Sequence, residues 1–382
     1  MSTSSITRSG PEAAPPVDRG GGARPMNYTF LTGGSWKGNG TLQRIEDLGA
    51  ALIRQGVRVS YVLDDVPDNR DHVRIDPAAR RAYVAPCTGW AQFRARAEAV
   101  QSTEPDFVHV MTPSPKAWLT MRRLPRVPVV GDWDEWPAIR KSYSWPRLRL
   151  VRHVDRWLRR RSVLRVVASQ YMQRRFRDDF GQDALYLPHG MFDRRFPPDG
   201  PSPFARPTAV YLGSLYPAYD HDVLFDAMRE LKARGEAPDL LMITDGPDEA
   251  RWRQFARDHG LDNVHMPGRM DGDLLARHLR HAHVLLFPLR TSDINMCRCP
   301  GKVFFYAVAR RPVIATRVGE VAAVLGDRAT YVEPTADAFA DAISAAMAAP
   351  RQPDVTYEVG TWDDRARVLL EALASVKTAG HR

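Results

Sequence analysis

The densest group of residues able to do chemistry lies at 287–321, where an apolar run is followed by a polar loop and then an apolar helical pattern. The loop carries Arg290, Asp293 and Arg298, and a helix is expected to open at residues 300–302. Proline suits the first turn of a helix because its missing N–H would be unpaired there, and glycine lets a ligand approach the backbone. Free N–H groups at a helix start, beside a lysine and an arginine, would hold a diphosphate. An ordinary loop with solvated arginines would contain the same residues.

A second candidate site follows the first apolar segment, where residues 33–40 read Gly-Gly-Ser-Trp-Lys-Gly-Asn-Gly. The loop separates a strand expected at 27–32 from an amphipathic helix expected at 41–56. Backbone amides of such a loop can meet phosphate oxygens without a Cβ clash, although a plain strand-to-helix turn would have the same composition. The loop residues that we assign to a diphosphate or to a second substrate are Gly34, Lys37, Gly38 and Gly40.

A third candidate site is the sequence Gly-Asp-Trp-Asp-Glu-Trp at 131–136, which follows a strand expected at 127–132. Asp132 and Asp134 could act catalytically by orienting a hydroxyl, an amine or a thiol. Trp133 and Trp136 could stack on a sugar or another ring. The structural alternative is that Asp132 caps the next helix and that both tryptophans belong to the core.

The elements expected around these sites are strands that alternate with helices. Strands are expected at 27–32, 57–63, 107–111, 127–132, 163–169 and 184–188, and then at 208–213, 239–244, 263–267, 283–289, 312–316 and 329–333. Helices expected at 221–234, 247–259, 271–281, 302–311 and 335–348 separate the second series. Residues 196–207 contain five prolines and are predicted to be a linker. The pattern indicates an α/β protein of two Rossmann-like domains, whose ligands bind at the carboxyl ends of the strands.

Length and composition fit that organisation. The 382 residues are enough for two or three domains, and 44% hydrophobic with 26% charged residues is typical of a globular chain. The net charge of +9 comes almost wholly from arginine, since only six residues are lysines, and it identifies no partner by itself. Cys297 and Cys299 are too close in sequence for an ordinary disulfide or a tetrahedral metal site of their own, so structural zinc is not expected. No apolar run approaches the roughly 20 residues of a membrane span. We therefore expect a cytoplasmic protein with a disordered tail at residues 1–25.

An arginine-rich segment at 147–165 is predicted to be an amphipathic helix. Its inward positions would be Leu148, Val151, Val154 or Asp155, and Leu158, and its outward positions Arg147, Arg152, Arg156, Arg159 and Arg160. Such a face suits peripheral contact with the inner face of a membrane, but it is also what a solvated helix looks like. We expect no nucleic-acid partner, because neither aromatic interleaving nor a known binding module is present.

Residues 300–316 contain the pattern Pro-x-Lys-x-x-x-Tyr-x-x-x-x-x-Pro-Val-x-Ala-Thr. This pattern resembles the donor-site signature of glycosyltransferase family 4 and its teichuronic-acid-type relatives. Other motifs agree in order and spacing: a Gly-Asp-Gly-Pro-like turn at 243–247, a strand ending in Gly-Arg at 263–269, a hinge at 187–191, and a final helix from Trp362. The resemblance covers about residues 27–378.

The resemblance implies a GT-B fold, with two Rossmann-like domains facing a central cleft and a C-terminal helix that crosses back to the first domain. The expected parts are a tail at 1–25, an acceptor-side domain at 26–198, a nucleotide-sugar-binding domain at 204–355, and the crossing helix at 356–382. It also implies a retaining transfer from a UDP- or GDP-sugar, without a metal or another cofactor. The acceptor would be a small molecule of natural-product type or a lipid-linked molecule of the cell envelope.

In a retaining transfer of this kind, no protein nucleophile is needed, and the protein must stabilise the departing diphosphate. Lys302 and Arg298 are the residues expected to do so. Asp293 lies where the family places an acidic residue against sugar hydroxyls, although a loop-capping role suits it equally. The residues expected to bind the donor are Gly213, Ser214, Asp245, Gly246, Arg269, Arg290, Asp293, Pro300, Gly301, Lys302 and Phe305.

Two departures from the family pattern bear on this expectation. Phe305 stands where the family has a glutamate that grips the ribose. The segment from Gly213 to Asp220 lacks the arginine and the lysine that the family places there on the diphosphate. Either Arg290, Arg298 and Lys302 compensate, or donor binding is altered, or activity is lost. The alternatives are an impaired homologue that binds nucleotide or glycan without transfer, an epimerase on the same fold, and a basic binder of membranes or nucleic acid.

Overall fold

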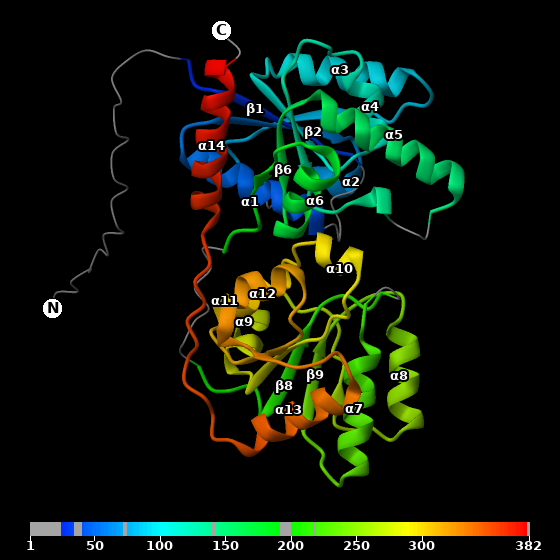
Figure 1. Ribbon diagram of the computed structural model, residues 1–382, viewed down its shortest axis with the longest axis vertical. Coiled ribbons are helices and arrows are strands. Elements are labelled where there is room, and N and C mark those ends of the chain that lie inside the picture. The colour runs from blue at the N-terminus through cyan, green and yellow to red at the C-terminus, as the bar shows by residue number, and fades with distance from the viewer. Residues whose placement is uncertain are drawn as a thin grey trace, which may run out of the picture.

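The computed structural model describes residues 24–33, 40–71, 75–139, 143–191, 200–216 and 219–379. Most of the expected tail lies outside these residues, as do Gly34, Lys37 and Gly38 of the glycine-rich loop. Figure 1 shows two α/β halves stacked along the long axis of the molecule, each built on its own sheet.

The first half contains seven parallel strands in the order β3-β2-β1-β4-β5-β6-β7. The strands are β1 (Asn27–Leu31), β2 (Arg58–Asp64), β3 (Arg80–Val84), β4 (Phe107–Met111), β5 (Val129–Trp133), β6 (Ser162–Val167) and β7 (Leu185–Tyr186). The three central strands β1, β4 and β5 are buried along their whole length, because helices cover the sheet on both sides.

The helices of this half connect consecutive strands. They are α1 (Gly40–Arg54), α2 (Pro67–Arg70), α3 (Ala91–Ser102), α4 (Pro115–Met121), the 3₁₀ turn η1 (Pro137–Ile139), α5 (Trp145–Arg161) and α6 (Gln170–Phe180). Helix α1 packs on one face of the sheet, and α3, α4 and α5 cover the other. Two apolar clusters, one on each face, hold the sheet between these layers.

The second half contains six parallel strands in the order β10-β9-β8-β11-β12-β13. The strands are β8 (Thr208–Leu212), β9 (Asp239–Ile243), β10 (Val264–His265), β11 (Val284–Phe287), β12 (Val313–Ala315) and β13 (Thr330–Tyr331). The helices are α7 (Asp222–Ala233), α8 (Glu249–Asp258), α9 (Gly272–His281), α10 (Asp293–Cys297), α11 (Lys302–Ala309), α12 (Gly319–Leu325), the 3₁₀ turn η2 (Gly326–Arg328) and α13 (Ala336–Ala348). None of the helices in the described residues has the length and apolar character of a membrane span.

The predicted alternation of strands and helices in two Rossmann-like halves is confirmed. Strand β3 and helix α10 are among the elements that the sequence did not predict. Strand β3 reads Arg-Arg-Ala-Tyr-Val and lies at the sheet edge, half exposed, so it lacks the apolar run of a central strand. Helix α10 lies inside the expected polar loop, where the Ser292 side chain accepts a hydrogen bond from the backbone N–H of Asn295 and caps it.

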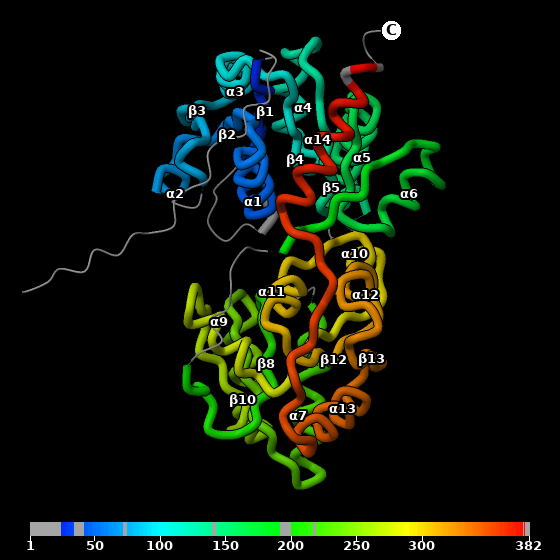
Figure 2. Tube along the Cα trace, turned by 90° about the vertical axis from the view of Figure 1, so that its left-hand side faces the viewer, coloured from blue at the N-terminus to red at the C-terminus, as the bar shows by residue number. Residues whose placement is uncertain are grey.

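The chain returns to the first half at its C-terminal end, as the resemblance implied. Figure 2 shows the segment after α13 running along the second half up to the first. Met191 pairs with Thr361 in an isolated bridge, and α14 (Trp362–Ala379) then packs against α1. Trp362, Ala366, Leu369 and Leu373 are buried in the same apolar cluster as strand β1. The two halves are therefore tied together by the hinge and by the C-terminal helix.

Gly190 should be the position of the hinge that is most sensitive to a side chain. A Cβ there would lie 2.5 Å from the backbone nitrogen of Trp362 and 2.7 Å from its Cα, and neither atom can move without shifting α14. We expect Gly190→Ala to lower the free energy of unfolding by about 1–3 kcal/mol, measured by urea denaturation.

Gly200→Ala is the matched control, because a Cβ at Gly200 would meet nothing within 4 Å. Equal stability of the two variants would contradict the close contact at the hinge.

Candidate functional site

The predicted donor residues gather where the order of the second sheet reverses. Strands β8 and β11 are neighbours in the sheet although two strands and three helices separate them in the chain, so their carboxyl ends open a crevice. Gly213 follows β8, the loop from Arg290 follows β11, and Lys302 begins α11. The sequence therefore predicted correctly which segments would come together at this edge.

Lys302 is held against aromatic rings at the end of strand β8. Its Nζ donates a hydrogen bond to the Tyr211 hydroxyl at 2.7 Å and lies 4.2 Å from the Tyr211 ring centroid and 4.6 Å from that of Phe287. A Cβ on Gly213 would lie 2.9 Å from Nζ, so only glycine lets the backbone approach this closely. Burial, and then the charge of Arg298, lowers the pKa of Lys302 well below its ordinary value.

Arg298 supplies a second cation beside Lys302. Its guanidinium carbon lies 4.5 Å from the ring centroid of Tyr219, and its Nε is buried with no hydrogen-bond partner. Within the described residues, no carboxylate comes within 4 Å of either cation to form an ion pair. Two adjacent, partly buried positive charges without a counter-ion create a strong local attraction for an anion.

Tyr211 and His221 orient Lys302, and sequence reasoning missed both. The Tyr211 hydroxyl lies 3.1 Å from His221 Nε2. Burial, followed by the charge of Lys302, lowers the pKa of His221 to about 3, so the imidazole is neutral at pH 7 and its Nε2 can accept the hydroxyl proton. Tyr211 then keeps a lone pair for the Lys302 ammonium. The one available signal was a tyrosine placed two residues before a glycine at the end of an apolar strand.

Arg290, the third cation expected to compensate, is already neutralised. Its guanidinium makes two hydrogen bonds to Asp222, at 2.6 and 2.9 Å, and one to Asp220 at 3.2 Å. The hydrogen bond to Asp222 raises the pKa of Arg290. The prediction that Arg290 meets a diphosphate therefore needs correction, because two carboxylates occupy its guanidinium and leave the compensation to Arg298 and Lys302.

The remaining donor candidates are spread around the crevice. Ser214 is half-buried, and the turn at residues 245–246 lies against Leu215, whose N–H donates to the Asp245 carbonyl at 2.6 Å. Arg269 is exposed and is engaged with Asp271 at 3.3 Å. The structure thus places the turn beside the end of β8, whereas Arg269 points to a carboxylate of its own segment.

The loop and helix around Lys302 also contact the first half. Asp293 is exposed and accepts a hydrogen bond from the Tyr171 hydroxyl at 2.8 Å. Pro300 and Gly301 are half-buried, and a Cβ on Gly301 would be in ordinary contact with His189 at 3.9 Å. Phe305 packs half-buried against the apolar cluster of the second half. An apolar ring therefore occupies the position at which the family resemblance implied a carboxylate.

Asp132 lies inside the first half rather than on the cleft surface. It sits in strand β5 with 0% of its surface exposed, 2.9 Å from Arg44 Nε and 3.2 Å from His109 Nε2. Burial alone would raise the pKa of Asp132, but Arg44 and His109 outweigh burial and lower it. The structure corrects both readings of Asp132: it caps no helix, and its carboxylate is enclosed in a buried ion pair.

The neighbouring residues of this motif are also held by the protein. Asp134 lies 3.2 Å from His189 Nε2 and is buried. Trp133 donates from Nε1 to Asp155 at 2.9 Å and packs edge-on against Phe176, and Trp136 is buried in the same cluster. The tryptophans therefore belong to the core, as the structural alternative had it, and neither ring is available for stacking on a sugar.

Arg44 was not foreseen, although it organises this edge of the first half. It also donates to the Leu187 carbonyl at 2.6 Å, so it links α1, β5 and the start of the hinge. Its Nη1 is buried without a partner in the described ranges of the chain. His109 joins Tyr28 to Asp132 through its two ring nitrogens. An arginine among the apolar positions of helix α1 was the signal for a buried partner.

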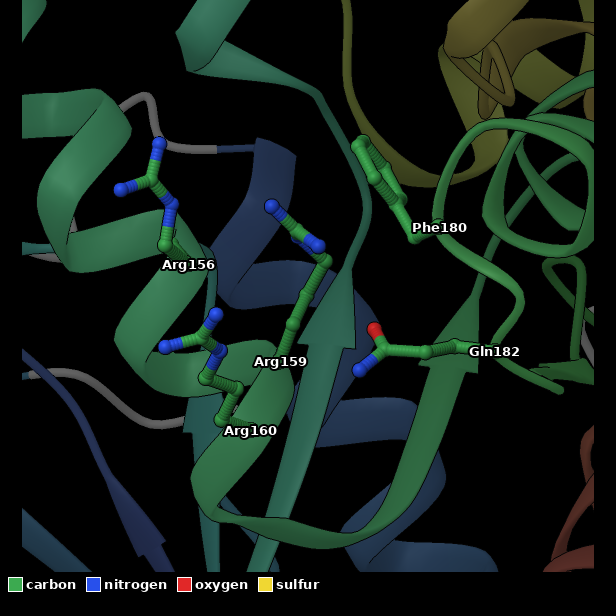
Figure 3. Close-up of a pocket in the computed structure, with 5 residues that line it drawn as sticks. All are labelled: Arg156, Arg159, Arg160, Phe180 and Gln182. Atoms are coloured by element: carbon green, nitrogen blue, oxygen red, sulfur yellow. The ribbon is translucent and has the colours of Figure 1, made fainter.

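Helix α5 carries the arginine-rich segment, and one of its predicted outward positions is wrong. Arg159 is buried, 2.9 Å from Asp155, with its guanidinium carbon 3.6 Å from the Phe180 ring centroid. It lines a hollow of about 420 Å³ with Arg156, Arg160, Phe180 and Gln182 (Figure 3). Arg156 and Arg160 are exposed as predicted, and Arg159 turned inward because a carboxylate one turn earlier and an aromatic face receive it.

Two family models match the chain. "Glycosyltransferase Family 4" matches residues 38–191, in the first half, and "Glycosyl transferases group 1" matches residues 206–349, in the second.

Curated relatives are similar to part of the chain. The GDP-mannose-dependent alpha-(1-6)-phosphatidylinositol monomannoside mannosyltransferase of Mycobacterium tuberculosis (strain ATCC 25618 / H37Rv) is 30% identical over 257 residues, which cover 60% of this chain and 66% of the relative. The enzyme of the same name from Mycolicibacterium smegmatis is 29% identical, covering 62% and 68%. The chain thus spans just under two thirds of the length of the first of these relatives.

Solved structures share the fold at low sequence identity. A glycosyltransferase from Rickettsia africae ESF-5 has a TM-score of 0.65 at 14% identity, covering 93% of this chain and 94% of that one. Anabaena Alr3699/HepE, solved in complex with UDP and glucose, has a TM-score of 0.67 at 16% identity, covering 94% and 100%. This likeness confirms the predicted GT-B arrangement of two Rossmann-like halves.

The buried ion pair of the first half gives a stability prediction. Arg44→Met would leave the Asp132 carboxylate buried without its main cation, and we expect the free energy of unfolding to fall by about 3–5 kcal/mol. The double variant Arg44→Met, Asp132→Leu removes both charges and should recover most of that loss. Urea denaturation checks both values, and a double variant no more stable than Arg44→Met would contradict the account of Asp132.

Proposed function

The chain belongs to glycosyltransferase family 4, and from that premise we propose that it is an enzyme that transfers a sugar from a nucleotide diphosphate to an acceptor. The observation that carries the proposal is the pair of unneutralised cations at the end of β8. Lys302 and Arg298 lie side by side, without a carboxylate partner in the described residues, at the crevice where a doubly wound sheet binds ligands.

The proposed chemistry is stabilisation of the leaving group. When the bond from the sugar to the diphosphate breaks, negative charge develops on the phosphate oxygens. Lys302, Arg298 and the backbone N–H groups at the start of α11 are positioned to receive that charge, and we propose that they do so without a metal ion. The protonated Lys302 favours the departing diphosphate more than the intact donor, because the charge on the departing group is greater.

The donor that we propose is a GDP- or UDP-sugar. GDP-mannose is the first donor to test, because the curated mannosyltransferases are named for it, and a solved neighbour was obtained with UDP and glucose. For the acceptor we propose either a small molecule of natural-product type or a lipid-linked molecule of the cell envelope. The first half would present the acceptor to the donor across the cleft.

Retention of the anomeric configuration is part of the proposal. Retention without a protein nucleophile requires no free carboxylate beside the sugar, and the three carboxylates expected to act on the acceptor or on the sugar hydroxyls each have a protein partner. Asp132 pairs with Arg44, Asp134 with His189, and Asp293 accepts from Tyr171. The acceptor would then lose its proton to a donor phosphate oxygen.

A membrane contact through α5 also stays a proposal. Arg156 and Arg160 are exposed at the hollow of Figure 3, and neither is engaged by an acidic side chain of the described residues. Two such charges would strengthen attraction to an anionic membrane surface, whereas Arg159 is committed to Asp155. A cytoplasmic location at the inner membrane face would fit this contact.

The second candidate function is an impaired homologue that binds nucleotide or glycan without transfer. The observation that favours it is Phe305, which packs half-buried against the core and cannot accept hydrogen bonds from ribose hydroxyls. A donor bound without that clamp would be held mainly through its diphosphate. Binding without turnover of GDP-mannose, UDP-glucose or any other sugar nucleotide would favour this candidate.

The donor site gives a prediction for one lysine. We expect GDP or UDP to raise the melting temperature of the wild-type chain, and Lys302→Ala to abolish that shift and to lower kcat/KM of transfer about 10²–10³-fold. The substitution should leave the fold intact, because the charge that it removes has no carboxylate partner within the described residues.

Lys232→Ala is the matched control, since this exposed helical lysine donates only to the carbonyls of His259 and Gly260, away from the crevice. If no nucleotide raises the melting temperature of the wild type, the transferase proposal is contradicted. Unchanged turnover in Lys302→Ala would refute the role of Lys302.

A further inference from the structure

A hollow of about 400 Å³ opens in the first half beside the ends of strands β4 and β5. Thr112 and Ser114 follow β4, and Glu135 follows β5. Tyr143 lies just before α5, and Arg147 lies in the first turn of that helix. Three prolines and two aliphatic side chains of α5 complete its wall. A hollow of this volume accommodates one small-molecule group.

The hollow lies at the edge of the sheet that faces the second half. Two of the hydrogen bonds between the halves join residues that follow the carboxyl ends of strands in both sheets. Tyr171, just after β6, donates to Asp293, and the Gln170 N–H donates to Glu320 at 2.6 Å. The carboxyl ends of β4 and β5 point to the same side because every strand of the sheet is parallel. A molecule bound there would face the donor crevice.

Thr112 departs from ordinary protein structure in two independent ways. Its φ is +54°, a left-handed conformation that is an outlier for a β-branched residue. Its Oγ1 is buried and has no hydrogen-bond partner among the residues that the structure describes. Strained residues and unpaired buried polar groups persist at sites where a ligand completes the structure. Both features belong to one side chain that lines the hollow.

The wall of the hollow favours a particular kind of ligand. The Arg147 guanidinium carbon lies 4.2 Å from the Tyr143 ring centroid. A hydrogen-bond donor therefore lies next to an aromatic ring on this wall. Glu135 adds a carboxylate that accepts hydrogen bonds, and Thr112 a hydroxyl that does both. A purely apolar ligand would leave these polar groups desolvated without hydrogen bonds. A ring with apolar C–H faces and many hydroxyls satisfies the whole wall.

We propose that this hollow binds the acceptor through a hydroxylated ring, either a sugar or a cyclitol, with the Thr112 hydroxyl as one of its hydrogen-bonding contacts. The proposal rests on the proposed transferase function and names the acceptor class for it. It replaces the stacking site expected at Trp133 and Trp136, since those rings are buried and the hollow opens beside them at Glu135.

The test compares ring binding in variants of Thr112. Calorimetry or saturation-transfer NMR on the full chain would use methyl α-mannoside, methyl α-glucoside and myo-inositol as probes. Thr112→Gly removes the hydroxyl and also permits the positive φ, so we expect equal or higher thermal stability with ring binding about tenfold weaker or more. Thr112→Ser keeps the hydroxyl and should bind the ring like the wild type.

Glu104→Gly is the matched control for the backbone. Glu104 also has a positive φ, +49°, but it lies before β4, at the opposite edge of the sheet from the hollow. This variant should gain stability in the same way and bind the ring unchanged.

Each result decides the proposal. The proposal is supported if Thr112→Gly weakens ring binding and Thr112→Ser binds the ring like the wild type. Absence of binding to all three rings, equal binding by Thr112→Gly, or inorganic phosphate competing at the hollow would overturn it. GDP and UDP titrated into the same samples separate the two claims. If nucleotide binds but no ring does, only the proposal that the hollow binds the acceptor is overturned. If a ring binds but no nucleotide does, the hollow is still a ring-binding site and the proposed transferase function is contradicted.

Discussion

Two neighbouring cations, Lys302 and Arg298, have no carboxylate partner among the described residues, and the proposed donor crevice depends on them. Holding positive charge away from water is costly unless an anion approaches, so the surrounding residues are arranged to keep the charge in place. Gly213 leaves room for the ammonium, and Tyr211, anchored on neutral His221, fixes its direction. Arg290, in contrast, is neutralised and serves to hold the loop after β11 against Asp220 and Asp222. Within the described residues, the positive charge of the crevice that has no carboxylate partner is thus concentrated at Lys302 and Arg298.

The two halves contribute in different ways. The first half is fixed internally by the Arg44–Asp132 pair, which joins α1 to β5 beneath the cleft and removes Asp132 from the surface. The hinge and α14 then bring this half against the second, with Gly190 in close contact with the start of α14. What remains at the surface beside β4 and β5 is the hollow at Thr112. In our proposal, the positive charge for the donor therefore lies in the second half, and the hydroxyl recognition of the acceptor lies in the first.

Features that depend on nearby sequence could be predicted, and features that depend on distant partners could not. The alternation of strands and helices and the helix start at Lys302 follow from local patterns, and both are present in the structure. Asp132 was misread because its cation lies 88 residues away, and Arg290 because its carboxylates lie 68 and 70 residues away. Arg159 turned inward for Phe180, which belongs to the next helix. Side-chain periodicity carries no information about such pairings.

The most direct test of the account is calorimetric titration of GDP and UDP at a series of pH values, in two buffers of different ionisation enthalpy. Burial and Arg298 lower the pKa of Lys302 in the free chain, and a diphosphate beside it would raise that pKa again. The wild type is therefore predicted to take up protons when nucleotide binds, and to bind more weakly as the pH rises, whereas Lys302→Met should take up none. Binding of nucleotide by the wild type without proton uptake, or the same uptake in Lys302→Met, would contradict the central claim.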